Sequence, residues 1–255
     1  MRFSQLPTET QAAILSFELA VDLLINMPDD EVLDIFSRLN SYAVVLNEQE
    51  KINATHFSSF KILADKIGRK YLEYWRDQGI LTSSGILRMQ EVSLVSDLLI
   101  AMREGIKPKK QIRRYYDEYE KEGNYEDDIG DVEVKFDAVI AKIVQIYPEG
   151  LREKEFSRPY AFYSLFTAVA HCLYGLKAGD PKVANYILLA RGVSLESDSE
   201  IQRARNALDA VQELYSEEMV SFSKEDIEFL RDSRRATTDE PVRKRRTNYL
   251  LKKMA

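Results

Sequence analysis

The sequence predicts a mostly α-helical protein, a multi-helical array, and three observations support this class. Apolar residues make up 45% of the 255-residue chain and charged residues 31%, with only ten glycines and seven prolines, which is typical of helix-rich globular proteins. Apolar side chains recur every three to four positions over much of the chain. Two of these stretches open with Asn or Ser followed three residues later by an acid, the pattern of a helix N-cap.

The first helix is expected over residues 8–15, directly after a proline. Residues 17–25 are compatible with either a continuation of that helix or a strand. Two short helices are expected next, one after Pro28 and one from Asn47, where Glu50 completes a capping pattern.

Longer segments with a helical apolar period follow. The expected helices cover residues 57–78, 88–102, 108–119, 131–147, 160–176, 181–190, 199–220, 223–233 and 241–253. The segment 160–176 is the most apolar and is expected at the centre of the array. Aromatic residues such as Tyr71, Tyr74 and Trp75 are compatible with base stacking, but their helical spacing favours packing in the core.

Two motifs between residues 36 and 54 resemble a known family. They comprise Phe36, Arg38, Leu39 and Asn40 at a helix end, then Leu46, Asn47, Gln49 and Glu50 at the next helix start, with Asn53 and Ala54 one turn on. This pattern resembles the middle of domain-of-unknown-function family 262. In that family it follows a ParB-like catalytic domain that contains an Asp-Gly-Gln-Gln-Arg motif, and the basic residues after position 233 resemble the end of many members.

The resemblance implies a domain organisation. Residues 1–46 would be a remnant edge of the ParB-like catalytic domain, and residues 47–255 a helical C-terminal domain with a basic terminal helix. Residues 19–25 would then be a short N-terminal strand left from the missing α/β domain. Because a strand without neighbours leaves its backbone groups unpaired, residues 17–26 are expected to self-associate or to pair with a separate catalytic subunit, or else to refold as helix.

Arg38 and Asn40 are the candidates that the family motif provides. The guanidinium of Arg38 can present a fork of donors to phosphate or carboxylate, and the amide of Asn40 can both donate and accept. The alternative is that Asn40 caps a helix C-terminus while Arg38 is solvated or ion-paired.

Positive charge is concentrated in two stretches. Residues 231–255 hold nine Lys and Arg against three Asp and Glu, so the net charge of −6 combines +6 in this tail with −12 in the other 230 residues. The candidate nucleic-acid-binding residues are Arg103, Lys107, Lys109, Lys110, Arg113, Arg114, Arg234, Arg235, Arg243, Lys244, Arg245 and Arg246. The alternative is a solvated helix whose cations pair with acidic neighbours. Sequence alone leaves open whether the two stretches share a face.

Catalysis by this chain alone is not expected. The two histidines, His56 and His171, lack the spacing of a metal site, so no metal and no cofactor are expected. The lone Cys172 lies in an apolar run, which favours a buried free thiol and a cytoplasmic location, and no apolar run is long enough to cross a membrane.

Two classes of function remain. One is the non-catalytic, DNA-contacting part of a nuclease-like protein, which the resemblance places among restriction and other anti-phage systems. The other is a protein-interaction scaffold that docks a separate catalytic subunit and has no nucleic-acid contact.

Overall fold

The computed structural model describes residues 3–18, 27–28, 31, 46–122, 129–177, 192–216 and 221–255. The chain divides into two compact units, residues 1–45 and residues 46–255, and the second is called the helical unit below. The expected helical domain began at residue 47, beside this boundary. The assignment of the first unit to a remnant of a catalytic domain stays a prediction.

The first unit contains the 3-10 helix η1 (Phe3–Gln5) and helix α1 (Thr8–Leu15), and α1 has no buried residue. Helix α1 begins at the predicted position. Its N-cap is Pro7, which offers no side-chain cap, and the side-chain amide of Gln11 instead donates to the carbonyl of Leu6 at 2.7 Å.

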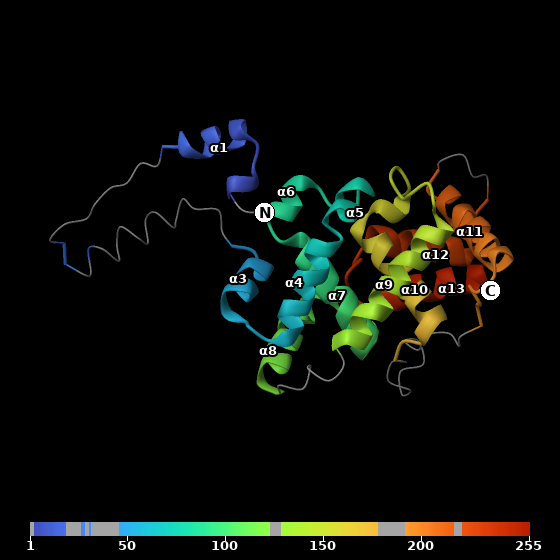
Figure 1. The fold of residues 1–255 in the computed structure, drawn as a ribbon. Helices are drawn as coiled ribbons and strands as arrows, with labels where there is room; N and C mark the ends of the chain where they lie inside the picture. The colour runs from blue at the N-terminus through green and yellow to red at the C-terminus, as the bar shows by residue number, and fades with distance from the viewer. Residues whose placement is uncertain are drawn as a thin grey trace. The chain divides into compact units, whose positions relative to one another are not determined.

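The helical unit is an array of short and medium helices (Figure 1). They are α3 (Glu48–Thr55), α4 (Ser59–Lys70), α5 (Leu72–Asp77), α6 (Ser83–Leu87), α7 (Gln90–Glu104), η2 (Lys109–Gln111), α8 (Ile112–Glu122), α9 (Ile129–Ile146), η3 (Glu155–Ser157), α10 (Pro159–Tyr174), α11 (Asp198–Glu213), α12 (Lys224–Arg234) and α13 (Glu240–Met254). No strand occurs among the residues that the structure describes. The predicted mostly α-helical class is therefore confirmed.

Helix α10 is the centre of the helical unit, as its apolar sequence predicts. It packs against α7, α9 and α13, and every residue from Ala161 to Cys172 is buried. Phe162 meets the ring of Trp75 edge-on at 5.6 Å, and Phe166 lies 5.0 Å from the ring of Phe136. Burying a side chain of this size contributes roughly 2–3 kcal/mol, so α10 holds the array together.

Predicted helix starts are well reproduced where a cap specifies them. The side chain of Asn47 accepts from the backbone N–H of Glu50, whose carboxylate accepts from the Asn47 N–H at 2.7 Å. Ser223 and Asp226 form the same reciprocal box at the start of α12. A capping box joins neighbours in sequence, which is why sequence shows it.

One predicted helix is divided in the structure, and another begins two residues later than predicted. Residues 57–78 form α4 and α5, separated at Tyr71, and the helix expected from residue 88 is preceded by α6 and begins after Met89. Met89 has φ 57° and ψ 29°, a left-handed conformation that costs roughly 1–2 kcal/mol for a residue with a side chain. The apolar period continues from α4 into α5, so spacing alone does not show the division at Tyr71.

Helix α13 positions most of the C-terminal basic residues. It packs against α10, α11 and α12, and residues 235–239 join α12 to α13. The rings of Phe229 on α12 and Tyr249 on α13 stack at 4.2 Å. The terminal helix is thus part of the core and not a solvated tail.

Three predicted segments lie outside the described residues: the strand or helix over residues 19–25, the helix after Pro28, and the helix over residues 181–190. Arg38 and Asn40 also lie outside them, so their roles stay predictions. Among the helices that the structure describes, none combines the length and apolarity needed to cross a bilayer.

Candidate nucleic-acid interface

Arg243, a predicted phosphate contact, is buried and ion-paired. Its side chain is 3% exposed and donates to the two carboxylate oxygens of Asp97 on α7 at 2.8 and 2.7 Å. It also donates to the backbone carbonyl of Lys107 at 2.8 Å, and the ring of Tyr163 lies 4.1 Å from the guanidinium carbon. Because the charged group lies inside the protein, Arg243 is not available to a phosphate.

The same correction applies to Lys244 and Arg246. Lys244 is 2% exposed and pairs with Glu240 at 2.6 Å. Arg246 is 1% exposed and donates to the carbonyls of Asp232 at 3.0 Å and Thr237 at 2.8 Å. The sequence-based prediction is wrong for these residues because α13 is packed on several sides, and a run of cations does not reveal that packing.

Arg245 is the member of this run that keeps contact with solvent. Its side chain is 39% exposed, and its guanidinium donates to both carboxylate oxygens of Asp232 at 2.7 Å. Asp232 itself is buried, so this pair ties α13 to α12. Arg245 therefore contributes little to a free positive surface.

The basic residues of α7 and α8 face carboxylates. Arg113 lies 3.2 Å from Glu48 on α3, and Arg114 lies 2.6 Å from Glu118 one turn along α8. Arg103 lies 3.5 Å from Glu104. Exposed pairs of this kind contribute at most about 1 kcal/mol, so Arg113 and Arg114 can exchange their partner for a phosphate at small cost.

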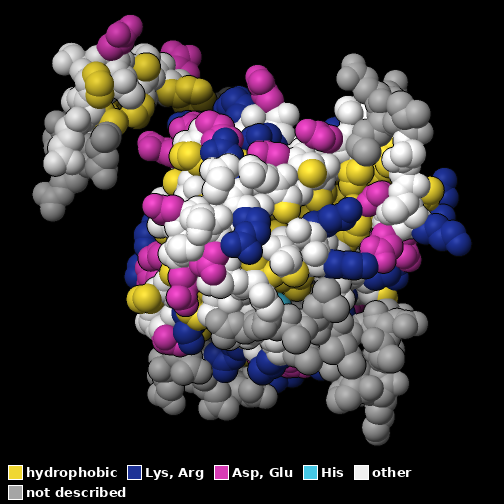
Figure 2. Space-filling view, turned by 90° about the vertical axis from the view of Figure 1, so that its right-hand side faces the viewer, with side chains coloured by type: hydrophobic (Ala, Val, Ile, Leu, Met, Phe, Trp, Pro, Cys, Tyr) yellow, Lys and Arg dark blue, Asp and Glu magenta, His cyan; other side chains and the backbone are white. Residues whose placement is uncertain are grey.

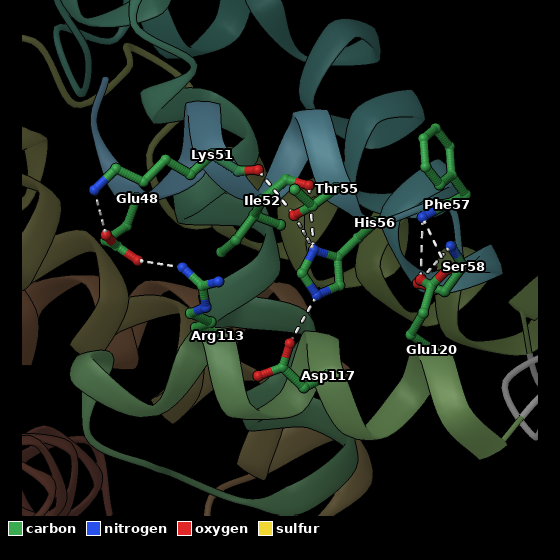
Figure 3. Close-up of polar contacts among 10 residues, drawn as sticks. All are labelled: Glu48, Lys51, Ile52, Thr55, His56, Phe57, Ser58, Arg113, Asp117 and Glu120. Atoms are coloured by element: carbon green, nitrogen blue, oxygen red, sulfur yellow. Dashed lines mark hydrogen bonds and ion pairs between the residues drawn. The ribbon is translucent and has the colours of Figure 1, made fainter. Parts of the chain in front are cut away.

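His56 belongs to a polar cluster that joins α3 to α8 (Figure 3). Its ring nitrogens lie 2.9 Å from a carboxylate oxygen of Asp117 and 2.9 Å from the hydroxyl of Thr55. The order hydroxyl, imidazole, carboxylate is that of a catalytic triad. However, the Thr55 hydroxyl donates to a backbone carbonyl, and the carboxylate of Glu120 occupies the two backbone N–H groups that precede α4. We interpret the cluster as structural.

The second histidine and the cysteine are also structural. A ring nitrogen of His171 accepts from the backbone N–H of Leu176 at 3.0 Å, which satisfies the chain just beyond α10. Cys172 is buried and forms no disulfide. Within the described ranges, no three His, Cys, Asp or Glu side chains are grouped in a way that could hold a metal ion.

Within the described part of the two basic stretches, five exposed cations remain, and we call them the basic seam. They are Lys109, Lys110, Arg231, Arg234 and Arg235, and none of their side chains bonds or pairs with another residue that the structure describes. Arg231 was not predicted as a site residue, although it shares the last turn of α12 with Arg234. The side chain of Lys107, beside the seam, is half-buried.

The seam joins two basic stretches that are far apart in sequence. The backbone N–H of Lys109 donates to the carbonyl of Thr238 at 3.1 Å, so η2 lies against the loop between α12 and α13. Arg235 is three residues from Thr238, which places their Cα atoms within about 11 Å. The two stretches that sequence left unplaced are thus neighbours in space.

A second interpretation of the seam is that its cations stabilise the end of α12 and form part of an ordinary mixed-charge surface. Cations in the last turn of a helix stabilise it through the helix dipole, which applies to Arg231 and Arg234. Figure 2 shows that on the face it draws, Lys and Arg side chains are interspersed with Asp and Glu. The lack of partners is therefore what sets the seam residues apart, since most of the other cations in the two basic stretches are paired.

Comparison with known proteins gives no relative. No family model, no curated protein and no solved structure matches this chain.

Proposed function

We propose that the helical unit is a nucleic-acid-binding module that contacts phosphates through the basic seam. The observation that carries this proposal is the contact between Lys109 and Thr238, because it gathers unpaired cations from both basic stretches at one place. By its resemblance, the chain would act as a non-catalytic part of a nuclease-like protein in an anti-phage or restriction system.

Local charge is what makes the proposal physically reasonable. The chain has a net charge of −6, which opposes binding to a polyanion over long distances. At contact, each phosphate neutralised by Lys or Arg releases condensed counterions, and this gain depends on the nearby cations. A group of unpaired cations can therefore bind nucleic acid on a protein with a negative net charge, with an affinity that falls steeply as salt increases.

A salt titration tests the proposal. We expect wild-type protein to bind a fluorescent duplex or single strand, with a log–log salt slope of about 0.7–0.9 per phosphate contact. The variant Lys109→Ala/Lys110→Ala/Arg234→Ala/Arg235→Ala should lose about one unit of slope per lost contact. These side chains are exposed and unpaired among the described residues, so the fold should be retained, which circular dichroism checks.

The matched control is Arg203→Ala/Lys224→Ala. Both side chains are exposed and unpaired among the described residues, and Lys224 begins the helix that Arg234 ends, about 15 Å away. The control should keep the wild-type slope. No binding by the wild-type protein, or equal slopes for the seam variant and the control, would contradict the proposal.

The alternative is a scaffold that docks another chain, and one observation favours it. Ile14, Leu15 and Phe17, in and just after α1, are 50%, 75% and 72% exposed. Apolar side chains exposed together often mark a protein interface. Nucleic-acid binding that depends on the seam would favour the first function, whereas association that depends on these three residues would favour the second.

A further inference from the structure

A hollow near the start of α10 adjoins the basic seam at Arg234. It has a volume of about 520 Å³ and lies where the N-terminus of α10, the chain after α11 and the C-terminal end of α12 meet. Arg158, Tyr160, Tyr215, Ser233 and Arg234 line it. Glu155 and Thr237 complete the lining, so two guanidinium groups, four hydroxyl-bearing side chains and one carboxylate surround the open space.

A third guanidinium lies behind the wall of this hollow. Arg246 is 1% exposed, and it donates to the backbone carbonyls of Tyr160 at 3.4 Å and Thr237 at 2.8 Å, both residues of the wall. It also donates to the hydroxyl of Ser164 at 3.0 Å and lies 5.2 Å from the ring of Tyr160.

The charge of Arg246 is not balanced by an ion pair within the described residues. The carboxylate of Asp232 is held by Arg245, and Arg246 contacts only the Asp232 backbone carbonyl. Burial, together with the nearby charge of Arg243, lowers the pKa of Arg246 to about 10, so the group is still charged at neutral pH. The nearest carboxylate, that of Asp232, favours the charged form of Arg246 but is bonded to Arg245, so an anion in the adjoining hollow would further stabilise the buried cation.

The carboxylate that lines the hollow, that of Glu155, already has partners. The carboxylate of Glu155 accepts from the hydroxyl of Tyr160 and pairs with Arg158 at 3.1 Å. With this acid counted, Arg158, Arg234 and the buried Arg246 leave an excess of two positive charges at the site. Arg158 is 65% exposed and can turn from Glu155 toward a ligand at small cost.

We propose that this hollow binds a phosphate or phosphate monoester. Arg158 and Arg234 would contact the anion directly. The Tyr215 hydroxyl donates to Ser233 at 2.8 Å and the Ser233 hydroxyl donates to the carbonyl of Phe229, so these two groups shape the wall and the arginines provide the hydrogen bonds to the anion. The hollow is larger than a phosphate ion, so it has room for the group that carries the phosphate. That group is either a free mononucleotide or the 5′ end of a strand.

Titration calorimetry with three probes tests this site. The probes are inorganic phosphate, adenosine 5′-monophosphate, and one oligonucleotide with and without a 5′-phosphate. Wild-type protein should bind the first two, or should prefer the phosphorylated oligonucleotide. Arg158→Ala/Arg234→Ala should weaken this binding about tenfold or more, and Arg158→Lys/Arg234→Lys should restore part of it because the charge is kept.

Variants of the seam separate this site from the proposed function. Lys109→Ala/Lys110→Ala should leave phosphate and mononucleotide binding unchanged, and so should Arg203→Ala/Lys224→Ala. If the 5′-phosphate adds affinity to the oligonucleotide, and Arg158→Ala/Arg234→Ala removes this added affinity while Lys109→Ala/Lys110→Ala does not, the source is a strand end. The proposal is overturned if wild-type protein neither binds phosphate or mononucleotide nor prefers the 5′-phosphate, or if the Arg158→Ala/Arg234→Ala variant binds like wild type.

Discussion

Arg243 and Arg245 are two residues apart in one basic run, yet they have different surroundings. Arg243 points into the core and forms an ion pair with Asp97, whereas Arg245 stays partly exposed and pairs with Asp232. A buried pair is not itself strong evidence for stability, but removing one partner leaves a charge without compensation. Replacing Arg243 is therefore expected to change stability and not nucleic-acid binding.

Breaking the buried pair should destabilise the protein strongly. We expect Arg243→Ala to lower the free energy of unfolding by about 3–5 kcal/mol, because Asp97 is then left buried and unpaired. Urea unfolding measures this. Lys252→Ala is the control on the same helix, since Lys252 and Glu225 are both more than half exposed, and its cost should be below about 1 kcal/mol. Equal costs for the two variants would show that the Arg243 pair is not buried in solution.

Asp226 should make the stability of the protein depend on pH in the acidic range. Burial opposes its charged form, but hydrogen bonds from Tyr249 and Ser223 outweigh burial and hold the pKa of Asp226 below its usual range. The carboxylate therefore stabilises the fold above the unfolded-state pKa of about 3.9, and this contribution is lost as pH falls below it. Thermal unfolding from pH 6 to pH 2 should show a smaller loss for Asp226→Asn than for wild type. The exposed Glu225→Gln variant should follow wild type.

At the scale of elements, sequence predicts what neighbouring residues decide. The boxes at Asn47 and Ser223 were predictable because both partners lie within four residues. The division at Tyr71 and the burial of Arg243 were not, since they depend on packing between segments: the Tyr71 hydroxyl donates to Asp137 on α9, and Asp97 is 146 residues from Arg243. Sequence shows which two stretches are rich in cations, but not which cations stay exposed and unpaired. Most of the predicted cations are buried or paired in the structure.

Two glycines should respond oppositely to replacement by alanine. Gly105 ends α7 with φ +79°, and a Cβ there would lie 2.7 Å from the backbone oxygen of Lys177, so Gly105→Ala should destabilise the protein by roughly 1–3 kcal/mol. Gly130 lies in α9, where an added Cβ would have nothing within 4 Å, and Gly130→Ala should stabilise by up to about 1 kcal/mol. Thermal melts of both variants check this, and a loss of stability in Gly130→Ala would contradict the packing described for α9.

At the scale of the molecule, the two units differ in how they bury apolar residues. The helical unit has a continuous core built around α10, whereas α1 contributes no buried residue. A segment with exposed apolar side chains can be stabilised by contact with a second copy of itself. Association through residues 17–26 stays a prediction, and the exposed side chains of Ile14, Leu15 and Phe17 offer an apolar surface on which it can be tested.

Removing the first unit should separate folding from association. Because residues 46–255 form a compact unit with its own core, we expect that fragment to keep its helical circular dichroism and to remain monomeric. The full chain should show a mass that rises with concentration in analytical ultracentrifugation. Ile14→Asp/Leu15→Asp/Phe17→Asp should abolish that rise, because charged side chains are costly to desolvate at an apolar interface.

The outcome also decides between the two functions. A full chain that stays monomeric at all concentrations would remove the argument for self-association, and docking to a different chain would then be the remaining form of the scaffold hypothesis. If the fragment of residues 46–255 binds DNA with the full salt slope, the seam acts without the first unit. If it binds only as the associated full chain, the affinity comes from several copies on one strand, since linked sites bind far more tightly than a single site.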